Sequence, residues 1–520
     1  MLPHSQPLLS RLVSSSTAAV ASNTCSGRFG TTSTPPGSSP NAQVATEPGY
    51  LGYLSHTFTN IFSHLPWPST SPPSEEKAVE KPPARIIKLK ASRNEVTTRT
   101  KVIVQKLLLA ESTSSTLLRI KELSDHLQEF PPTRLAAVQE PHLISLLVDL
   151  ESTSAEATVR AEARMCLRLC GYNNPPRSRG INLLSIDGGG TRGMMGLEVL
   201  EALEMASGGK KIHEMFDHIV GVSTGAIIAT MLGIKKMSAS ECRKVYMDIS
   251  TKLFTQGKFS GATGLILNHS YYNTKKWIGM LKEILGEDSL ASTSRKEGVP
   301  NVCIVSSIVN LPVLQPYIFR NYESGAGRDS AYRGGTSNFL WQAVQASAAA
   351  PGYFEEVVLG SVLHQDGGVI ANNPTAIGVH EAKHVWPGEE VNCVVSVGNG
   401  RSVQELEPTP LFIATKAHHK LLKIIDSATD TEAVHVSMRD LLSEKVYYRL
   451  NPYMTHPYGL DEIQPARLDL MVTDAKLYVR RNLSKIEAAA ERLTRPPTTI
   501  QVLKRSLQNL KDRNGLYVPR

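Results

Sequence analysis

From residue 180 onward, short apolar runs alternate with longer stretches in which apolar residues recur at helical spacing. The apolar runs predict strands at Ile181–Ile186, His218–Val222, Val302–Ser306, Tyr317–Arg320 and Val391–Val397. The amphipathic stretches between them predict helices at about residues 193–206, 240–254, 274–285, 338–350 and 374–385. This alternation indicates an α/β fold, a three-layer sandwich whose mostly parallel central sheet is covered by helices on both faces.

The pattern differs on either side of this region. Residues 95–175 contain several amphipathic segments but no strict repeat period, which predicts a layer of paired helices that resembles a degenerate solenoid. Beyond residue 400 the spacing is again mainly helical. We therefore divide the chain into a disordered targeting or linker region, a helical region, the α/β domain and a mainly helical, finally basic C-terminal region, at residues 1–90, 91–178, 179–378 and 379–520.

The first 90 residues are rich in Pro and Ser and lack the apolar residues of a core. The N-terminus is rich in Ser, Thr and Ala, contains Arg11 and Arg28, and has its first acidic residue at Glu47. This composition favours a mitochondrial transit peptide, and a merely disordered tail is the alternative. Between residues 50 and 67, aromatic and apolar residues predict a segment that lies on a membrane interface or docks on the fold.

Charge and cysteine content narrow the possible partners. The 520-residue chain has a formal charge of +8, and eleven of its Lys and Arg residues lie between Lys476 and Arg520. A solvated helical face explains this stretch most simply. Attraction to anionic lipid headgroups is the alternative, and the absence of an aromatic-basic motif argues against nucleic acid. Six cysteines without a regular framework indicate a reducing compartment, with Cys166 and Cys170 as core residues.

The first candidate for chemistry is the glycine turn in "LLSIDGGGTRGMMGLEVLEALE", which starts at Leu183. Gly188, Gly189 and Gly190 stand between a predicted strand and a predicted helix, where backbone N–H groups can bind an anion. The spacing of Gly188, Gly190 and Gly193 also matches a dinucleotide fingerprint, but no acidic residue ends the next strand. A sugar-kinase phosphate turn would join two strands of a hairpin. The anion is therefore a phosphate or a transient oxyanion.

The second candidate is Gly221-Val222-Ser223-Thr224-Gly225, a G-x-S-x-G sequence at a strand-to-helix junction. A nucleophile elbow needs glycine at Gly221 and Gly225, because strand and helix crowd the serine there. This motif does not determine which residue acts as the base for Ser223. Downstream histidines are available, and the candidates are His364, His380, His384, His418, His419 and His435. Asp366, which precedes Gly367 and Gly368, is the other candidate.

In this order, the glycine turn, the elbow and the Asp-Gly-Gly motif resemble the patatin-like phospholipase family. The resemblance covers about residues 180–400, and "ASAAAPGYF", "HQDGGVIANNP", "DSATDTEAVH" and "YYRLNP" are similar to a calcium-independent branch of that family. It implies a Ser-Asp dyad in which Ser223 is the nucleophile and Asp366 is the base, with no histidine between them. It also implies an oxyanion hole at Gly188 to Gly190. Arg192 contacts the lipid phosphate or steadies the turn, and Asp187 stabilises the turn.

The resemblance further implies hydrolysis of fatty-acyl esters of glycerophospholipids, and of lysophospholipids, through an acyl-enzyme without a metal or cofactor. The expected partners are a phospholipid substrate and the surface of an anionic membrane. The expected location is intracellular and membrane-associated, with the mitochondrion ahead of the endoplasmic reticulum or the peroxisome. Some family members end in Ser-Lys-Leu, whereas this chain ends in Val-Pro-Arg. The alternatives are a non-catalytic lipid-binding scaffold and, less favoured, a sugar kinase.

Overall fold

The structure is a computed structural model that describes residues 92–255, 272–402 and 431–517. These residues belong to one compact unit, Lys88–Arg520. The predicted transit peptide, the aromatic segment at 50–67, His418, His419 and the first part of "DSATDTEAVH" lie outside the described residues.

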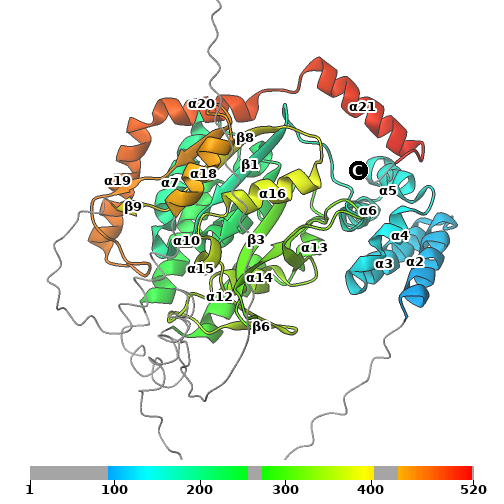
Figure 1. Cartoon of the computed structure of the whole chain (residues 1–520), viewed down its shortest axis with the longest axis horizontal. Helices are drawn as coiled ribbons and strands as arrows, with labels where there is room; N and C mark the ends of the chain where they lie inside the picture. Colours follow the sequence, from blue (N-terminus) through cyan, green and yellow to red (C-terminus); the bar gives the residue numbers. More distant parts are fainter. Residues whose placement is uncertain (1–91, 256–271, 403–430, 518–520) are drawn as a thin grey trace, which may run out of the picture. The chain divides into compact units, whose positions relative to one another are not determined.

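A central sheet runs in the order β10-β8-β1-β2-β3-β4-β5 (Figure 1). These strands are β10 (Tyr447–Leu450), β8 (Val391–Val397), β1 (Ile181–Ile186), β2 (His218–Val222), β3 (Asn301–Ile308), β4 (Gln315–Arg320) and β5 (Arg333–Gly335). The first five are mutually parallel, whereas β4 is antiparallel to β3. A hairpin of β6 (Val357–Leu359) and β7 (Val362–Asp366) adds β7 antiparallel to β3. The predicted fold class is confirmed.

Alternate residues of β1 enter two separate hydrophobic cores. Leu184 and Ile186 pack on one face, against apolar residues from α7, α10, α19 and α20. Leu183 packs on the other face, against α16 and α18. These helices are α7 (Gly193–Ala206), α10 (Ala239–Phe254), α19 (Pro465–Arg481), α20 (Leu483–Thr494), α16 (Thr375–Val385) and α18 (Thr431–Leu441). Because successive strand residues face opposite sides, this alternation buries both faces of the sheet.

Shorter elements complete this part of the chain. They are α8 (Ile212–Met215), α9 (Thr224–Ala229), α12 (Thr274–Leu285), α13 (Leu290–Thr293), α14 (Leu340–Ser347), α15 (Gly368–Ala371), β9 (Arg401–Ser402) and β11 (Tyr453–Met454), with a 3-10 turn at Gly190–Arg192 and a π turn at Thr230–Ile234. All five predicted strands and all five predicted helices are present. The described residues beyond 400 are mainly helical, as expected, but they also supply β10, which the sheet holds through parallel pairing with β8.

The N-terminal helices form a third core of their own. They are α2 (Arg93–Leu108), α3 (Thr113–Glu129), α4 (Arg134–Val138), α5 (Leu143–Thr153) and α6 (Ala157–Leu169), and Cys166 and Cys170 are buried free thiols among them. Helix α21 (Thr499–Arg513) packs against α5. Arg134 binds Glu323 at 3.0 Å, and Arg168 binds Asn301 at the start of β3, so polar contacts join this layer to the sheet.

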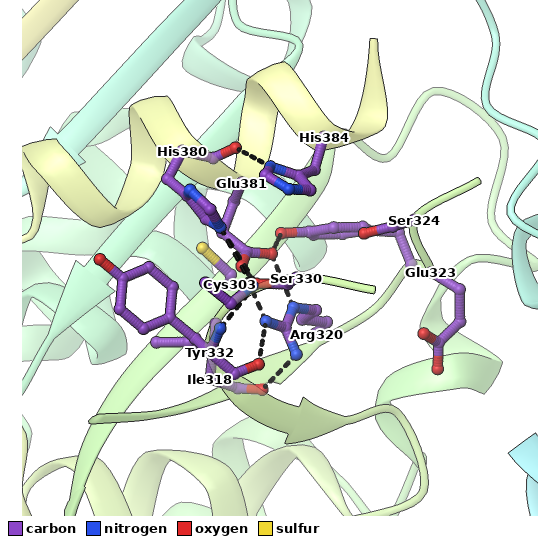
Figure 2. A network of polar contacts seen from close by, with 12 residues as sticks. Cys303, Ile318, Arg320, Glu323, Ser324, Ser330, Tyr332, His380, Glu381 and His384 are labelled. Atoms are coloured by element: carbon purple, nitrogen blue, oxygen red, sulfur yellow. Dashed lines mark hydrogen bonds and ion pairs between the residues drawn. The ribbon is translucent and has the colours of Figure 1, made fainter. Parts of the chain in front are cut away.

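A buried ion pair joins β4 to α16, which covers one face of the sheet (Figure 2). The Arg320 guanidinium donates through Nε and Nη2 to the two oxygens of Glu381, at 2.6 and 2.7 Å. The hydroxyls of Tyr322 and Ser330 also donate to this carboxylate, at 2.9 and 2.6 Å. Although burial opposes ionisation of Glu381, these donors hold its pKa at about 2. The Glu381 carboxylate is therefore ionised, and its contacts hold α16 against β4.

No helix within residues 92–255, 272–402 and 431–517 is both long enough and apolar enough to cross a membrane.

Candidate active site

The carboxyl ends of β1 and β2 bring the glycine turn and the G-x-S-x-G sequence to one edge of the sheet. Ile186 lies beside Gly221 in the sheet register, and Gly221 lies beside Ile304 of β3. Just beyond the end of β2, on the same edge of β3, Asp366 at the end of β7 pairs with Ser306. Three motifs that are far apart in the chain therefore meet where these strands end.

Ser223 has the backbone conformation of a nucleophile elbow. Its φ is 54° and its ψ is −123°, a left-handed region that side chains rarely adopt and that costs about 1–3 kcal/mol. A Cβ atom at Gly221 would overlap the carbonyl oxygen of Gly225, and one at Gly225 would overlap that of Ile186. The Ser223 N–H donates to Ser347 Oγ at 2.9 Å. The strained turn is therefore held by glycine contacts and by Ser347.

The Ser223 hydroxyl donates to Asp366 Oδ2 at 2.6 Å. The other carboxylate oxygen, Oδ1, accepts from the Gly368 N–H at 2.7 Å, and a Cβ at Gly367 would overlap the carbonyl of Val305. Asp366 is buried. Burial raises its pKa to about 6, although the hydrogen bonds from Ser223 and Gly368 favour the charged form.

The four candidate histidines that the structure describes make their contacts with residues other than Ser223. His364 bonds to Ser306 Oγ at 2.9 Å, and burial lowers its pKa to about 4. Along α16, His384 Nδ1 bonds to the His380 carbonyl at 3.0 Å (Figure 2), and His380 Nε2 accepts from the Ala331 N–H at 3.3 Å. His435 bonds to the hydroxyl of Tyr447 at 3.2 Å. Of the predicted bases, Asp366 is the one that the structure brings to Ser223.

The glycine turn has a definite pattern of donors. The Gly188 N–H donates to the Asn372 carbonyl at 3.2 Å, so this predicted oxyanion donor already has an acceptor. Neither Gly189 nor Gly190 donates its N–H to a partner in the described residues. Both line the same cavity as Ser223, whereas Gly188 does not. In the described residues, two of the three glycine N–H groups of the turn thus lack an acceptor and belong to residues that line the cavity of Ser223.

Neighbouring side chains fix the orientation of this turn. The Gly189 carbonyl accepts from the Arg192 N–H and Nε, both at 3.2 Å. The Gly190 carbonyl accepts from the Thr224 hydroxyl at 2.9 Å and from the Tyr246 hydroxyl at 2.7 Å. Gly193 begins α7, and a Cβ there would overlap the Thr224 methyl group. The turn is therefore held from the elbow and from α10.

Asp187, directly before the turn, forms a buried ion pair. Its Oδ2 lies 2.6 Å from Arg449 Nη2, and the two side chains are 2% and 4% exposed. Arg449 belongs to β10, the strand that periodicity alone did not predict. The expected stabilising role of Asp187 thus has a partner that lies in the C-terminal region.

The cavity at Ser223 is mainly apolar and has a volume of ≈ 110 Å³. Its lining combines the polar pair with aliphatic and aromatic side chains from α9, α10, α12 and the segment after α14. These apolar residues are Ile227, Tyr246, Ile249, Leu253, Phe254, Trp277, Ala348, Ala350, Pro351, Tyr353, Phe354, Val369 and Leu460.

Several residues that shape the site were not among the predicted ones. Ser347 and Tyr353 lie in "ASAAAPGYF" and Asn372 lies in "HQDGGVIANNP", so the sequence contained a signal for them in the stretches that resemble the family. Arg449 lies in "YYRLNP", another of these stretches, whereas Tyr246 reaches the turn from a helix whose periodicity says nothing about this contact.

The raised pKa of Asp366 predicts a pH-dependent stability. An unfolded Asp has a pKa of about 3.9, so between about pH 4 and pH 6 the folded state binds more protons and stability falls as pH rises. Asp366→Asn removes this penalty. We expect denaturant titrations to show the variant gaining about 2 kcal/mol on the wild type between about pH 4.5 and about pH 7.5. A pH-independent difference would contradict the raised pKa.

The comparisons with known proteins agree with this geometry. Residues 184–379 match the family model "Patatin-like phospholipase". The chain is 39% identical over 412 residues to "Calcium-independent phospholipase A2-gamma" of Homo sapiens, covering 79% of this chain and 52% of that protein. It is 29% identical over 416 residues to "Phospholipase A I" of Arabidopsis thaliana, covering 68% of this chain and 31% of that protein.

The chain thus spans about half the length of the mammalian relatives that it matches. The glycine turn, the elbow and the Asp-Gly-Gly motif all fall within the matched residues. The resemblance inferred from these motifs is confirmed, and the chain carries a patatin-like phospholipase domain.

Proposed function

We propose that the chain is a calcium-independent phospholipase A that hydrolyses fatty-acyl esters of glycerophospholipids, and of lysophospholipids, through an acyl-enzyme on Ser223. The observation that carries this proposal is the 2.6 Å hydrogen bond from Ser223 Oγ to Asp366 Oδ2 in an apolar cavity. The two relatives described above, both of them phospholipases, support it.

Asp366 acts as the base in this mechanism. Its carboxylate takes the proton of the Ser223 hydroxyl while Oγ attacks the ester carbonyl carbon. A base works best when its pKa is near the operating pH, and burial moves the pKa of Asp366 to about 6. The Gly368 N–H holds Oδ1, so Oδ2 faces the serine. Protonated Asp366 then returns the proton to the leaving lysophospholipid oxygen.

The N–H groups of Gly189 and Gly190 stabilise the oxyanion that forms at the carbonyl. Gly188 is excluded from this role by its bond to Asn372. Arg192 acts by position: it holds the Gly189 carbonyl, and because a trans peptide is planar, the Gly190 N–H of that peptide points the opposite way. The N-terminus of α7 adds a favourable partial charge. Water then hydrolyses the acyl ester, with Asp366 again as base.

The apolar lining of the cavity suits a fatty-acyl chain. Phe254, Tyr272, Tyr353, Phe354 and Trp277 form one aromatic cluster with ring centroids 5.0 to 6.0 Å apart. Four of them line the cavity. Apolar burial stabilises a bound chain by about 0.8 kcal/mol per methylene, which would hold the ester carbonyl against Ser223.

Removal of either member of the dyad should abolish turnover. We expect Ser223→Ala and Asp366→Asn each to lower hydrolysis of defined phospholipids, with calcium chelated, by at least about a thousandfold. Thermal melts check that both variants fold. His364→Gln, two residues before Asp366, is the matched control and should keep most of the activity. Loss of activity in the control, or turnover by either dyad variant, would contradict the dyad.

The pKa of Asp366 also predicts the pH profile. Only the carboxylate form accepts the serine proton, so kcat/KM should fall about tenfold per unit as pH decreases below about 6. Initial rates on a soluble short-chain phospholipid would measure this limb. A profile flat to about pH 4.5 would show that another group is the base.

The two alternatives from the sequence are less well supported. In the sugar-kinase interpretation the glycine turn joins two strands, whereas here α7 follows it. A lipid-binding scaffold would leave Ser223 unreactive, so labelling of Ser223 by a fluorophosphonate probe distinguishes it from an enzyme.

We propose that the chain associates peripherally with anionic membranes through α21. Ile500, Leu503, Leu507 and Leu510 recur at helical spacing and are 80, 61, 52 and 59% exposed. Lys504 and Lys511 adjoin this stripe, as expected for a helix that lies in a membrane interface. Arg505 and Gln501 hold α21 to the backbone just before β1, at 2.8 and 2.6 Å. Helix α21 thus contacts the chain at the amino end of β1, whereas Ser223 lies at the carboxyl ends of the strands. We propose that α21 tethers the protein to the membrane.

Other basic residues of the C-terminal stretch are engaged within the protein. Lys485 donates to the Arg449 carbonyl, Arg492 to that of Asn392, and Arg513 lies 3.8 Å from Asp149. These three basic residues therefore bind other parts of the protein, and we do not assign them to the membrane contact. A mitochondrial location rests on the composition of the N-terminus, and fractionation of cells that express the full chain would test it.

The tether predicts a specific effect of Leu507→Gln. Because a buried Leu contributes about 1.5–3 kcal/mol, we expect vesicle affinity to fall at least about tenfold. Asn509→Gln on the same helix is the control and should bind like the wild type. Sedimentation with vesicles of increasing anionic lipid content measures both, and wild-type affinity should fall with salt. Salt-independent binding, or equal affinity of the two variants, would argue against α21 as the contact.

A further inference from the structure

A second cavity lies at the edge of the sheet beside β10, and it shares no lining residue with the cavity at Ser223. It has a volume of ≈ 480 Å³, within the usual range for ligand sites. Residues of β9, β10, β11, α18 and α19, and the start of α20, line it. The cavity is large enough for a small-molecule ligand.

Four cationic side chains line this cavity, and they are Arg401, Arg449, Arg481 and Lys485. Arg481 and Lys485 take part in none of the ion pairs between described residues. They flank Asn482, where α19 ends and α20 begins. Lys485 donates one of its three N–H groups to the Arg449 carbonyl at 2.7 Å, so both cations on this wall lack a carboxylate partner among the described residues.

Two buried guanidinium N–H groups in the same cavity also lack acceptors. Arg449 is 4% exposed, and its Nε finds no hydrogen-bond partner in the described parts of the chain. The same holds for Arg401 Nε. A buried donor without an acceptor costs free energy, so these groups mark a place where an acceptor from a ligand would be stabilising.

The two lining carboxylates are already engaged. Asp474 Oδ2 accepts from the Thr455 N–H and hydroxyl, both at 2.9 Å, and from the Tyr458 hydroxyl at 3.1 Å. Glu432 accepts from Asn451 at 3.2 Å and lies 3.6 Å from Arg401. The field that remains is positive: the pKa of Lys485 is lowered by burial and then by the charges of Arg401 and Arg449.

We propose that this cavity binds an anionic phosphate group, held by the side chains of Arg481 and Lys485 and attracted by the charges of Arg449 and Arg401. Phosphate offers several acceptor oxygens to guanidinium groups, which bind it through paired donors. The phosphate belongs to a lipid headgroup or to a soluble phosphate ester. Because Arg449 lines this cavity and also pairs with Asp187, the proposed site lies beside the residue that anchors the glycine turn.

Inorganic pyrophosphate is the probe for this site, titrated into the full chain at constant ionic strength and followed by calorimetry and thermal melts. We expect saturable binding and a melting temperature that rises with concentration. Arg481→Gln should weaken the affinity roughly tenfold, because a charge-assisted contact is lost. Arg480→Gln removes the same charge one residue earlier, outside the cavity lining, and should bind like the wild type. Lys485→Gln is a second test of the same wall.

The outcomes separate the proposal from non-specific charge attraction. Absence of saturable binding, or equal affinities of Arg481→Gln and Arg480→Gln, would overturn it. Vesicles that contain phosphatidic acid, compared with phosphatidylcholine vesicles, identify the source. Displacement of pyrophosphate by the former assigns a lipid headgroup, and retained pyrophosphate assigns a soluble phosphate. Binding is measured without substrate turnover, so failure of the proposed hydrolase activity would leave this result interpretable.

Discussion

The site depends on backbone approaches that are closer than a Cβ atom would allow. The Gly225 Cα lies against the carbonyl of Ile186, and the Gly367 Cα lies against that of Val305. These contacts draw the ends of β1, β2, β3 and β7 together, so the turn after β1, the elbow after β2 and the carboxylate of β7 can meet. A methyl group at any of these positions would push the strands' ends apart. The left-handed conformation of Ser223 persists because this surrounding structure over-determines it.

An ion pair with a residue outside the range that matches the family also constrains the site. Arg449 of β10 lies beyond residue 379, yet its guanidinium pairs with Asp187 directly before the glycine turn. Both groups are buried, and loss of one partner of a buried pair typically costs about 3–5 kcal/mol. The C-terminal region therefore contributes to the geometry of the turn, and α19 and α20 pack on the same core as α7.

The sequence predicts the parts of this structure that repeat a pattern. Long helices and central strands follow from periodicity, and Ser223 and Asp366 follow from short motifs whose glycines have a steric reason. Strand β10 could not be predicted this way, because Tyr447–Leu450 is short, contains Arg449 and gains its conformation from pairing with β8. The bond from Gly188 to Asn372 is equally invisible, since it depends on where two distant loops meet. The motifs therefore identify the residues of the site, whereas the packing of distant loops determines which backbone N–H groups lack an acceptor.

Glu381 and Asp366 are both buried, but the groups that donate hydrogen bonds to each carboxylate differ, and so do their pKa values. Glu381 receives the Arg320 guanidinium, which holds its pKa at about 2, so it remains charged and structural. The donors to Asp366 are the neutral Ser223 hydroxyl and Gly368 N–H, and burial then raises its pKa to about 6. A cation beside Asp366 would stabilise its charged form and weaken it as a base. The neutral surroundings that make Asp366 costly to ionise are thus the same feature that suits it to take a proton from serine without a histidine.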